Sequence, residues 1–415
     1  MKIALCSIGS RGDIQPFLIL GQHLTRQGHE VKVASAKMLA PLARDYDVTF
    51  HGFEGDYASM VDDESLKKAV GKNPFTVGKA LREKVYPIIG ESLETFYEMG
   101  LWADVVIYHP KTMIDGIGQG FQHKLIKAYV VPIFTPTRAF ANPLFSFLPI
   151  PRWLNRASYA MVGFALNSFN SPIKAFRKKH DLPQRANILD TPAMYAVSPS
   201  LLTQPADYPK DAHFTGLWTD DAPTQPLDQQ ITSFLAKNEK TLLLTFGSMP
   251  YKSKTDINIF IREILKHFGL NILIVKGWGL KDSVIDEDDR ILTIESAPFS
   301  TLFPRVDYVI HHGGAGTTAC ALTAGIPQLI TPILHPFGDQ YFWGKLIEHN
   351  EIGIEPMPLT KLTTKKLVSG LKTLLEPRFA QHAKQMQSSI IQENGLAVAT
   401  TIIANHYATH KPSQE

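Results

Sequence analysis

The chain opens on short apolar runs that alternate with longer amphipathic segments. Residues 2–6 form an apolar run typical of a buried strand, and a turn at 7–13 follows it. Over 14–27 the apolar side chains recur at helical spacing until Gly28 ends the pattern. A second apolar run at 31–34 predicts another strand. This order of strand, helix and strand predicts a βαβ unit and a parallel sheet of the Rossmann type.

The same rhythm continues along the rest of the chain in two series. The first series adds strand patterns at 105–108 and 128–134, and the second has them at 241–246, 271–275, 291–294, 308–310 and 328–331. Between the series lies a stretch rich in Asp, Pro, Thr and Gln, which is typical of a linker. We therefore predict a first domain, a linker, a second domain and a final helix, at 1–217, 218–234, 235–395 and 396–415.

The most distinctive motif joins the strand pattern that ends at 310 to a helix expected at 319–325. It reads His311-His312-Gly313-Gly314-Ala315-Gly316-Thr317-Thr318. Glycines let the backbone approach an anion, and a helix N-terminus offers unpaired N–H groups with a partial positive charge. The threonines add hydroxyl donors, and His312 adds a donor that can be cationic beside phosphate. A plain tight turn would explain the glycines alone, so we interpret the motif as a diphosphate-binding turn.

Two carboxylates stand at positions suited to chemistry. Asp13 falls at the predicted start of the first helix, where it can cap the helix, act as a base facing a cleft, or do both. Folds of this type bind their ligands at the turns after parallel strands. Further along, Gly338-Asp339-Gln340 offers a carboxylate and an amide that could hold sugar hydroxyls.

Taken together, the motifs at 9–16, 311–318 and 338–340 resemble the nucleotide-sugar glycosyltransferases with the GT-B fold. Within that family the resemblance is closest to the sterol glucosyltransferases and to bacterial enzymes that glycosylate lipids and antibiotic aglycones. The segments 109–111 and 134–140 also resemble the sterol branch. The resemblance covers most of the chain. It implies an α/β fold of two Rossmann-like domains whose parallel sheets face each other across a cleft, with the acceptor site in the first and the donor site in the second.

The resemblance also implies an activity. It is the transfer of a sugar, glucose from UDP-glucose first of all, to a hydroxyl of a hydrophobic acceptor such as a sterol, with inversion and without cofactor or metal. Polyphenols and macrolide aglycones are the alternative acceptors, and dTDP is the alternative nucleotide. Asp13 is then the catalytic base. The donor residues are Ser10, Arg11, Gly12, Ser248, Trp278, Ala297, Phe299, His312, Gly314, Ala315, Gly316, Thr317, Asp339 and Gln340. The acceptor residues are His109, Phe134, Thr135, Phe140 and Phe145.

Some of these assignments compete with plainer explanations. Ser248 follows a strand and is either a phosphate ligand or a helix cap. Trp278 either stacks on the nucleoside or packs beneath a loop. The acidic run at 286–289 contains a formal D-x-D sequence, which holds a divalent metal in another glycosyltransferase fold. It lies in a charged stretch far along the chain from the glycine turn, so we interpret it as a solvated loop.

Composition narrows the classes of function. A chain of 415 residues with 44% hydrophobic and 20% charged residues suits a globular protein of two domains. A net charge of +3 is too small to indicate nucleic acid as a partner. The two cysteines, Cys6 and Cys320, fall in different predicted domains, so we expect no disulfide and a cytoplasmic protein. We expect no signal peptide and no membrane span, since no apolar stretch reaches about 20 residues.

The segment 128–169 is rich in Phe, Pro and Leu, and a basic cluster at 174–179 follows it. Such a segment suits a lipid-like acceptor taken from a membrane surface, with peripheral membrane contact. The alternative is a loop packed on its own domain. Two rival functions also stand: a non-catalytic protein that binds sugar nucleotide or lipid, and a two-domain epimerase. Release of UDP only when an acceptor is present would separate the three.

Overall fold

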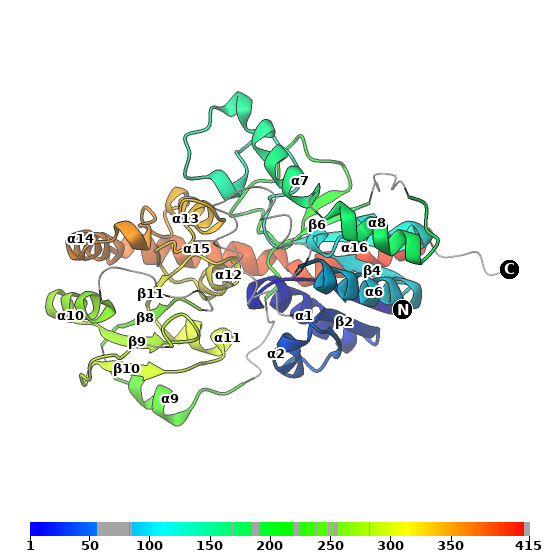
Figure 1. The fold of residues 1–415 in the computed structure, drawn as a ribbon. Coiled ribbons are helices and arrows are strands. Elements are labelled where there is room, and N and C mark those ends of the chain that lie inside the picture. The colour runs from blue at the N-terminus through cyan, green and yellow to red at the C-terminus, as the bar shows by residue number, and fades with distance from the viewer. Residues whose placement is uncertain are drawn as a thin grey trace.

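The computed structural model describes residues 1–55, 83, 85–167, 169–184, 191–219, 225–237, 239–247, 249, 251, 256–281 and 283–410. Over these residues the chain forms two α/β domains side by side, each built on a parallel sheet (Figure 1). The predicted α/β class with two Rossmann-like domains is confirmed.

The first sheet has seven strands in the order β3-β2-β1-β4-β5-β6-β7 among the described residues, and all its pairings are parallel. Its strands are β1 (Lys2–Cys6), β2 (Glu30–Ala36), β3 (Thr49–Phe53), β4 (Val105–Tyr108), β5 (Leu125–Tyr129), β6 (Ala193–Tyr195) and β7 (Ala212–Phe214). Its helices are α1 (Arg11–Arg26), α2 (Ala40–Arg44), α6 (Tyr86–Trp102), α7 (Ala160–Asn167), α8 (Asn170–Lys179) and α16 (Gly395–His410). The sheet grows outward on one side through β2 and on the other through β4, so the chain switches direction between β1 and β4.

The second sheet has the order β10-β9-β8-β11-β12 and is also parallel. Its strands are β8 (Thr241–Thr245), β9 (Asn271–Val275), β10 (Ile291–Ile294), β11 (Tyr308–His311) and β12 (Gln328–Ile330). Its helices are α9 (Gln229–Leu235), α10 (Ile257–His267), α11 (Phe299–Leu302), α12 (Ala315–Ala324), α13 (Gln340–His349), α14 (Thr364–Leu374) and α15 (Pro377–Glu393). Here the switch of direction lies between β8 and β11.

Strand β1 is buried on both faces because its alternate side chains point into two different cores. Ile3 and Leu5 pack with α1 and α16, whereas Ala4 and Cys6 pack with α6. A strand covered on both sides is expected to be apolar throughout, and this explains the uninterrupted apolar run at the start of the chain.

The strand predictions at 105–108, 271–275 and 291–294 are confirmed at their bounds. The strand predicted at 128–134 is wrong, because β5 spans Leu125–Tyr129 and irregular backbone follows. Pro132 has no N–H for a sheet ladder, which explains the early end. Strands β3, β6 and β7 were not predicted.

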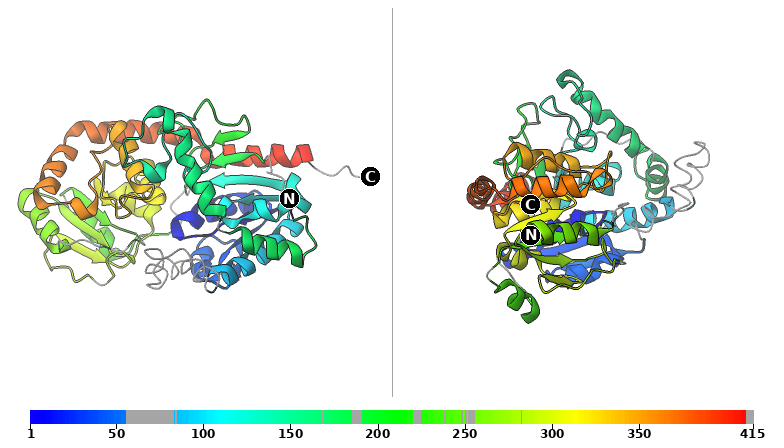
Figure 2. Two further views of the ribbon diagram at one scale, coloured as in Figure 1. Left: turned by 45° about the horizontal axis from the view of Figure 1, so that its top comes forward. Right: turned by 90° about the vertical axis from the view of Figure 1, so that its left-hand side faces the viewer.

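The last helix lies beside the first domain. After α15 the backbone turns at Asn394, which has a positive φ of 48°, and α16 follows it. Figure 2 shows α15 and α16, in orange and red, running past the second domain and along the first. Ala399 and Ile403 of α16 belong to the same core as α1. None of the described helices is long and apolar enough to span a membrane.

Candidate active site

The two switch points collect most of the predicted site residues. At the first, Asp13 lies in the first turn of the helix after β1, and His109 follows β4. At the second, the loops after β8 and β11 carry Gly247 and His312. Ligands of open parallel sheets bind at such a reversal, outside the carboxyl ends of the strands. The helices that follow β1 and β11, α1 and α12, contact each other across the two domains.

Asp13 lies in the first turn of α1 and is held by Ser10. The Ser10 backbone N–H and hydroxyl donate to Asp13 Oδ2 at 2.8 and 3.1 Å. Gly9 has a φ of +140°, and a Cβ there would lie 2.2 Å from Asp13 Oδ2, so the carboxylate needs glycine at this position. The N-cap of the helix is Ser10 rather than Asp13, which sits three residues further on and completes a capping box.

The other carboxylate oxygen is bound by Lys111. Lys111 Nζ donates to Asp13 Oδ1 at 2.7 Å, and the Asp13 side chain is only 18% exposed. Although burial opposes the ammonium form, Asp13 raises the pKa of Lys111. Burial likewise opposes the carboxylate, but Lys111 lowers the pKa of Asp13 below its ordinary value. The pair is therefore ionised at neutral pH. Sequence reasoning gave Lys111 no role, because no local pattern links residues 98 positions apart.

His109 supports this turn as a neutral ring. Its Nδ1 accepts the backbone N–H of Lys111 at 3.2 Å, so the proton sits on Nε2. Burial, with the Lys111 charge, lowers the pKa of His109 to about 3. The ring lies 5.4 Å from the ring of Phe134, centroid to centroid. Of the predicted acceptor residues, His109 and Phe134 thus lie together in the loops that surround Asp13.

The glycine turn at 311–318 has the predicted strand, turn and helix order. The helix, however, begins at Ala315 rather than at 319, with Gly314 as its N-cap. The unpaired backbone N–H groups of the first turn therefore belong to Ala315, Gly316 and Thr317. A helix of this length carries the partial positive charge that suits a diphosphate.

The adjacent histidines differ in role. His311 is fully buried and structural. Its Nδ1 accepts the Gly313 N–H at 3.1 Å, so its Nε2 donates to Gln328 Oε1 at 2.9 Å. These two hydrogen bonds fix the path of the turn and occupy both ring nitrogens of His311. Of the two histidines, His312 is therefore the one that can bind a ligand.

His312 is wedged between two glycines. A Cβ on Gly314 would lie 2.4 Å from its Nε2, and one on Gly247 would lie 3.2 Å from its Cε1. Among the described residues its buried Nδ1 has no hydrogen-bond partner. Burial lowers the pKa of His312 to about 3, with His311 contributing. The expected cationic donor is therefore a neutral imidazole in this structure, and it holds a buried nitrogen that a ligand can satisfy.

Asp339 and Gln340 lie beside the glycine turn. A Cβ on Gly313 would be 2.9 Å from the Gln340 carbonyl oxygen. The Gln340 side chain is buried, and its Oε1 accepts two backbone N–H groups of the preceding loop at 2.7 and 2.9 Å. Asp339 Oδ2 accepts Trp343 Nε1–H at 3.0 Å. Burial raises the pKa of Asp339, and that hydrogen bond works against the rise.

Charges of the two domains act on each other across the domain boundary. Besides burial, Asp13 raises and Lys111 lowers the pKa of Asp339. Asp339 in turn helps to raise the pKa of Lys111. The base candidate of the first domain and the sugar-binding candidate of the second are therefore close enough to interact.

The other predicted acceptor residues lie on the loop after β5 and on η6 (Pro143–Phe145). Thr135 is hydrogen-bonded to Tyr195. Phe140 packs on Phe342 of α13 at 5.7 Å between ring centroids, and Phe145 packs on Phe337 at 6.0 Å. Phe140 and Phe145 therefore make contacts between the two domains.

The remaining donor candidates vary in placement. Arg11 and Gly12 are exposed in the first turn of α1, and Arg11 is bonded to Gln15 at 3.1 Å. Trp278 is 63% exposed in the loop after β9, so the alternative of packing beneath a loop is wrong. Ala297 and Phe299 follow β10, and Phe299 packs on Phe303. Ser248 lies outside the described residues.

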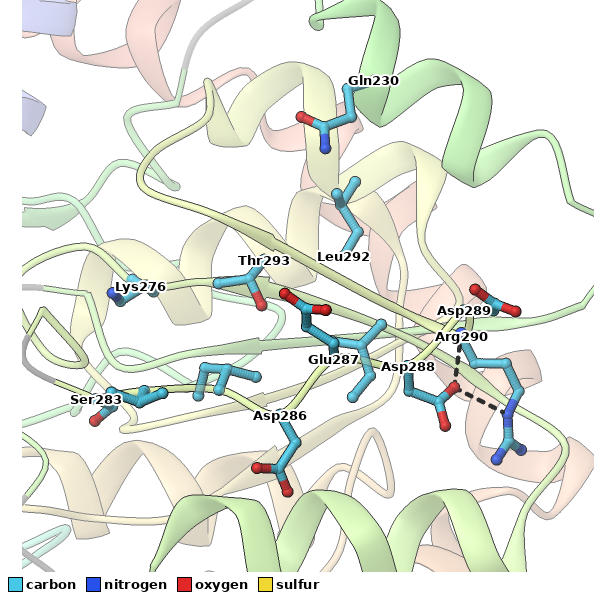
Figure 3. Close-up of a pocket in the computed structure, with 13 residues that line it drawn as sticks. Gln230, Lys276, Ser283, Asp286, Glu287, Asp288, Asp289, Arg290, Leu292 and Thr293 are labelled. Atoms are coloured by element: carbon cyan, nitrogen blue, oxygen red, sulfur yellow. Dashed lines mark hydrogen bonds and ion pairs between the residues drawn. The ribbon is translucent and has the colours of Figure 1, made fainter.

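The acidic run at 286–289 lines a separate open pocket on the outer edge of the second sheet (Figure 3). Asp286 accepts from Arg262 at 2.6 Å, and Asp288 accepts the backbone N–H of Arg290 at 2.8 Å. In the described part of the chain no group of three or more His, Cys, Asp or Glu side chains could hold a metal ion. The run therefore belongs to a loop paired with arginines.

Comparison with known protein families gives the class. Residues 3–115 match the glycosyltransferase family 28 N-terminal domain, and residues 272–402 match the C-terminal domain of proteins like erythromycin biosynthesis protein CIII. The first match covers the first switch point, and the second covers β11 and the glycine turn but not β8. The chain is a glycosyltransferase of the GT-B fold.

Relatives extend over nearly the whole chain. An O-mycaminosyltylonolide 6-deoxyallosyltransferase of Streptomyces fradiae is 27% identical over 97% of both chains. A sterol 3-beta-glucosyltransferase of Arabidopsis thaliana is 27% identical over 100% of this chain and 69% of its own length. A sterol 3-beta-glucosyltransferase of Candida albicans is 29% identical over 96% of this chain, which spans only 27% of that longer protein.

Solved structures share the fold. The glycosyltransferase of kitacinnamycin superposes with a TM-score of 0.73 at 15% identity and covers 98% of this chain and 99% of its own. The glycosyltransferase VinC, solved in complex with dTDP, gives a TM-score of 0.64 at 16% identity over 99% of this chain and 100% of its own.

Proposed function

We propose that this glycosyltransferase moves glucose from UDP-glucose to the hydroxyl of a hydrophobic, sterol-like alcohol, with inversion at the anomeric carbon. The observation that supports it most is the pairing of Asp13 and Lys111 in the first domain within electrostatic reach of Asp339, which lies beside the glycine turn in the second. An acceptor hydroxyl at Asp13 would then meet the anomeric carbon of a sugar held at Asp339.

In this mechanism Asp13 removes the proton of the acceptor hydroxyl as the oxygen attacks. Ser10 and Lys111 hold the carboxylate in place, so the group is oriented before substrate arrives. Attack from the face opposite the diphosphate turns an α-linked donor into a β-linked product. The C1–O bond to the diphosphate breaks as the new glycosidic bond forms.

The leaving nucleoside diphosphate carries the developing negative charge. The backbone N–H groups of Ala315, Gly316 and Thr317 would receive its oxygens, with His312 as a side-chain donor. The amide nitrogen of Gln340 and the Asp339 carboxylate would bind sugar hydroxyls. Trp278, exposed at the end of β9, would cover the nucleoside by stacking.

The relatives and structural neighbours supply the arguments for the acceptor and the nucleotide. The sterol glucosyltransferase names among the relatives support a sterol, and the Streptomyces enzyme supports a macrolide aglycone as the second candidate. A neighbour solved with dTDP keeps that nucleotide open beside UDP. A matrix of UDP- and dTDP-sugars against sterols, polyphenols and macrolide aglycones, read by mass, tests the proposal. Product from hydrophilic sugar acceptors alone would refute the acceptor class.

Replacing Lys111 by Gln is expected to shift the acid limb of the pH profile of kcat/KM to higher pH. The base must be ionised, and it loses its charge as the pH falls through the Asp13 pKa, which Lys111 lowers. Without the ammonium that pKa rises, so activity is lost sooner on acidification. Lys111→Arg retains the positive charge and should keep the limb near wild type. Superimposable profiles for Gln and wild type would remove Lys111 from this role.

Chelation is expected to leave the transfer rate nearly unchanged. The proposed clamp meets the diphosphate charge with a helix N-terminus and an imidazole, so no divalent ion is needed. Initial rates should agree within error when EDTA replaces added Mg²⁺ or Mn²⁺. A strict requirement for either ion would contradict the metal-free clamp and make the acidic run at 286–289 a candidate metal site.

A further inference from the structure

A lobe of the first domain, residues 139–167, projects away from both sheets at the top of Figure 1. Its outer part is a nearly continuous helical run made of η7 (Arg152–Leu154), η8 (Arg156–Tyr159) and α7. The lobe leaves the loop after β5 and returns to α8. It is thus an excursion from the first sheet, joined at its start to a hydrophobic core through Phe140.

The inward side of this helical run carries polar anchors beside the buried Tyr159. Asn155 and Ser158 face inward: Asn155 Nδ2 donates to the Arg138 carbonyl at 3.0 Å, and Ser158 Oγ accepts the Asn142 N–H at 2.8 Å. Surface helices of soluble proteins normally turn such polar residues to water and bury their apolar ones. Here the polar side chains are used for anchoring the run to the domain.

The outward positions are apolar or positively charged. Trp153 is 79% exposed and Met161 is 62% exposed. Between them Ala157 and Ala160 are also exposed, as are Arg152 and Arg156 beside the tryptophan. Since these positions recur every three or four residues, they share one side of the run. Large exposed apolar side chains grouped in this way mark an interaction site.

Charge identifies the kind of partner. No Asp or Glu occurs between Asp115 and Asp181, and all of the lobe lies inside that interval. Its exposed charges are therefore arginines alone. An apolar strip with tryptophan and two arginines matches the surface of a bilayer that contains anionic lipid. An acidic group is supplied from outside the lobe by Asp207, whose carboxylate interacts with Arg156.

We propose that the strip formed by Arg152, Trp153, Arg156 and Met161 docks the enzyme on an anionic membrane surface. Trp153 would lie at the level of the headgroups, and the two arginines would contact lipid phosphates. The docking proposal is argued from these four residues alone. The purpose of docking, which is to take up an acceptor dissolved in the bilayer, rests on the proposed function.

The position of the lobe suits that use. Phe145, in the same lobe, packs on Phe337 of the second domain, two residues before Asp339. The Gly338 N–H also donates to the Leu144 carbonyl at 3.3 Å. The lobe is therefore joined to the loop that leads into the proposed sugar site, so a docked lobe would hold the cleft close to the lipid surface.

Sedimentation of the full chain with vesicles tests the proposal. Vesicles of phosphatidylcholine with phosphatidylglycerol should bind the protein at low salt, and phosphatidylcholine alone should bind it much less. Arg152→Gln with Arg156→Gln should weaken binding by about fivefold per charge removed. Trp153→Ser should also weaken it. Val284→Ser is the matched control, since Val284 is 84% exposed on the second domain and should leave binding unchanged.

Three results would overturn the proposal. The wild-type protein could fail to sediment with anionic vesicles at low salt, or the lobe variants could bind these vesicles as well as the wild type does. Sedimentation velocity could also reveal a dimer that Trp153→Ser dissociates, which would make the strip a self-association surface. Transfer to a sterol presented in detergent micelles, which requires no vesicle, separates the two levels. Vesicle binding without any transfer would refute the proposed function and leave docking intact, whereas transfer without vesicle binding would do the reverse.

Discussion

Asp13→Asn should reduce transfer at least about a hundredfold, the usual contribution of a positioned general base. The amide cannot take the proton of the acceptor hydroxyl, but its oxygen can still accept from Ser10 as the carboxylate does. The helix start is therefore expected to survive the change. Donor binding should also survive, because the diphosphate contacts proposed here belong to the second domain. The measurement is kcat with saturating donor and acceptor, alongside the dissociation constant for UDP.

Two controls make this result interpretable. Asp286→Asn changes an exposed carboxylate that is paired with Arg262 at the far edge of the second sheet, and it should leave transfer unchanged. A thermal midpoint close to wild type would show that Asp13→Asn folds. If the folded Asp13 variant turned over at nearly the wild-type rate, Asp13 would be a member of the capping box and nothing more.

His312→Ala should weaken UDP binding and slow transfer together. A hydrogen bond to a charged group contributes roughly 1.5–3 kcal/mol, so the dissociation constant should rise about tenfold or more. The same bond would act on the leaving diphosphate, and therefore kcat should fall as well. Calorimetry with UDP measures the first effect, and initial rates at saturating donor measure the second.

His349→Ala is the matched control for the clamp. It removes an exposed imidazole at the end of α13 in the same domain and should change neither quantity. Wild-type affinity for UDP in a folded His312→Ala protein would take His312 out of the donor site. The buried Nδ1 without a partner would then need another explanation.

The sequence predicts those parts of the site that produce a local pattern of apolar and polar residues. The turn at 311–318 and the loop that begins at Gly9 each follow an apolar run and precede a helix, so their position at the ends of parallel strands could be inferred. The same patterns misplaced the start of α12 by four residues, because Gly316, Thr317 and Thr318 have low helix propensity. They also left Asp13 as a possible N-cap of α1, whereas the N-cap is Ser10, which offers the same capping chemistry.

The parts that could not be predicted depend on tertiary contacts. The Lys111–Asp13 pair joins two loops that only the adjacency of β1 and β4 brings together. His311 has a structural role because it is hydrogen-bonded to Gln328, which lies on the neighbouring strand β12. This contact distinguishes His311 from His312, and the local sequence does not reveal it. The contacts of Phe140 and Phe145 with the second domain depend on how the two domains are set, and a single segment carries no sign of that.

The most direct test of the account is the dependence of nucleotide release on the acceptor. UDP-glucose is supplied with and without a sterol in mixed micelles, and free UDP and glucosylated sterol are quantified together. The account predicts that UDP appears only with acceptor, in equal amount to a β-linked glucoside, and that Asp13→Asn abolishes both signals while UDP still binds. Release of UDP that is independent of any acceptor, or tight UDP-glucose binding with no product from any hydrophobic alcohol, would contradict it.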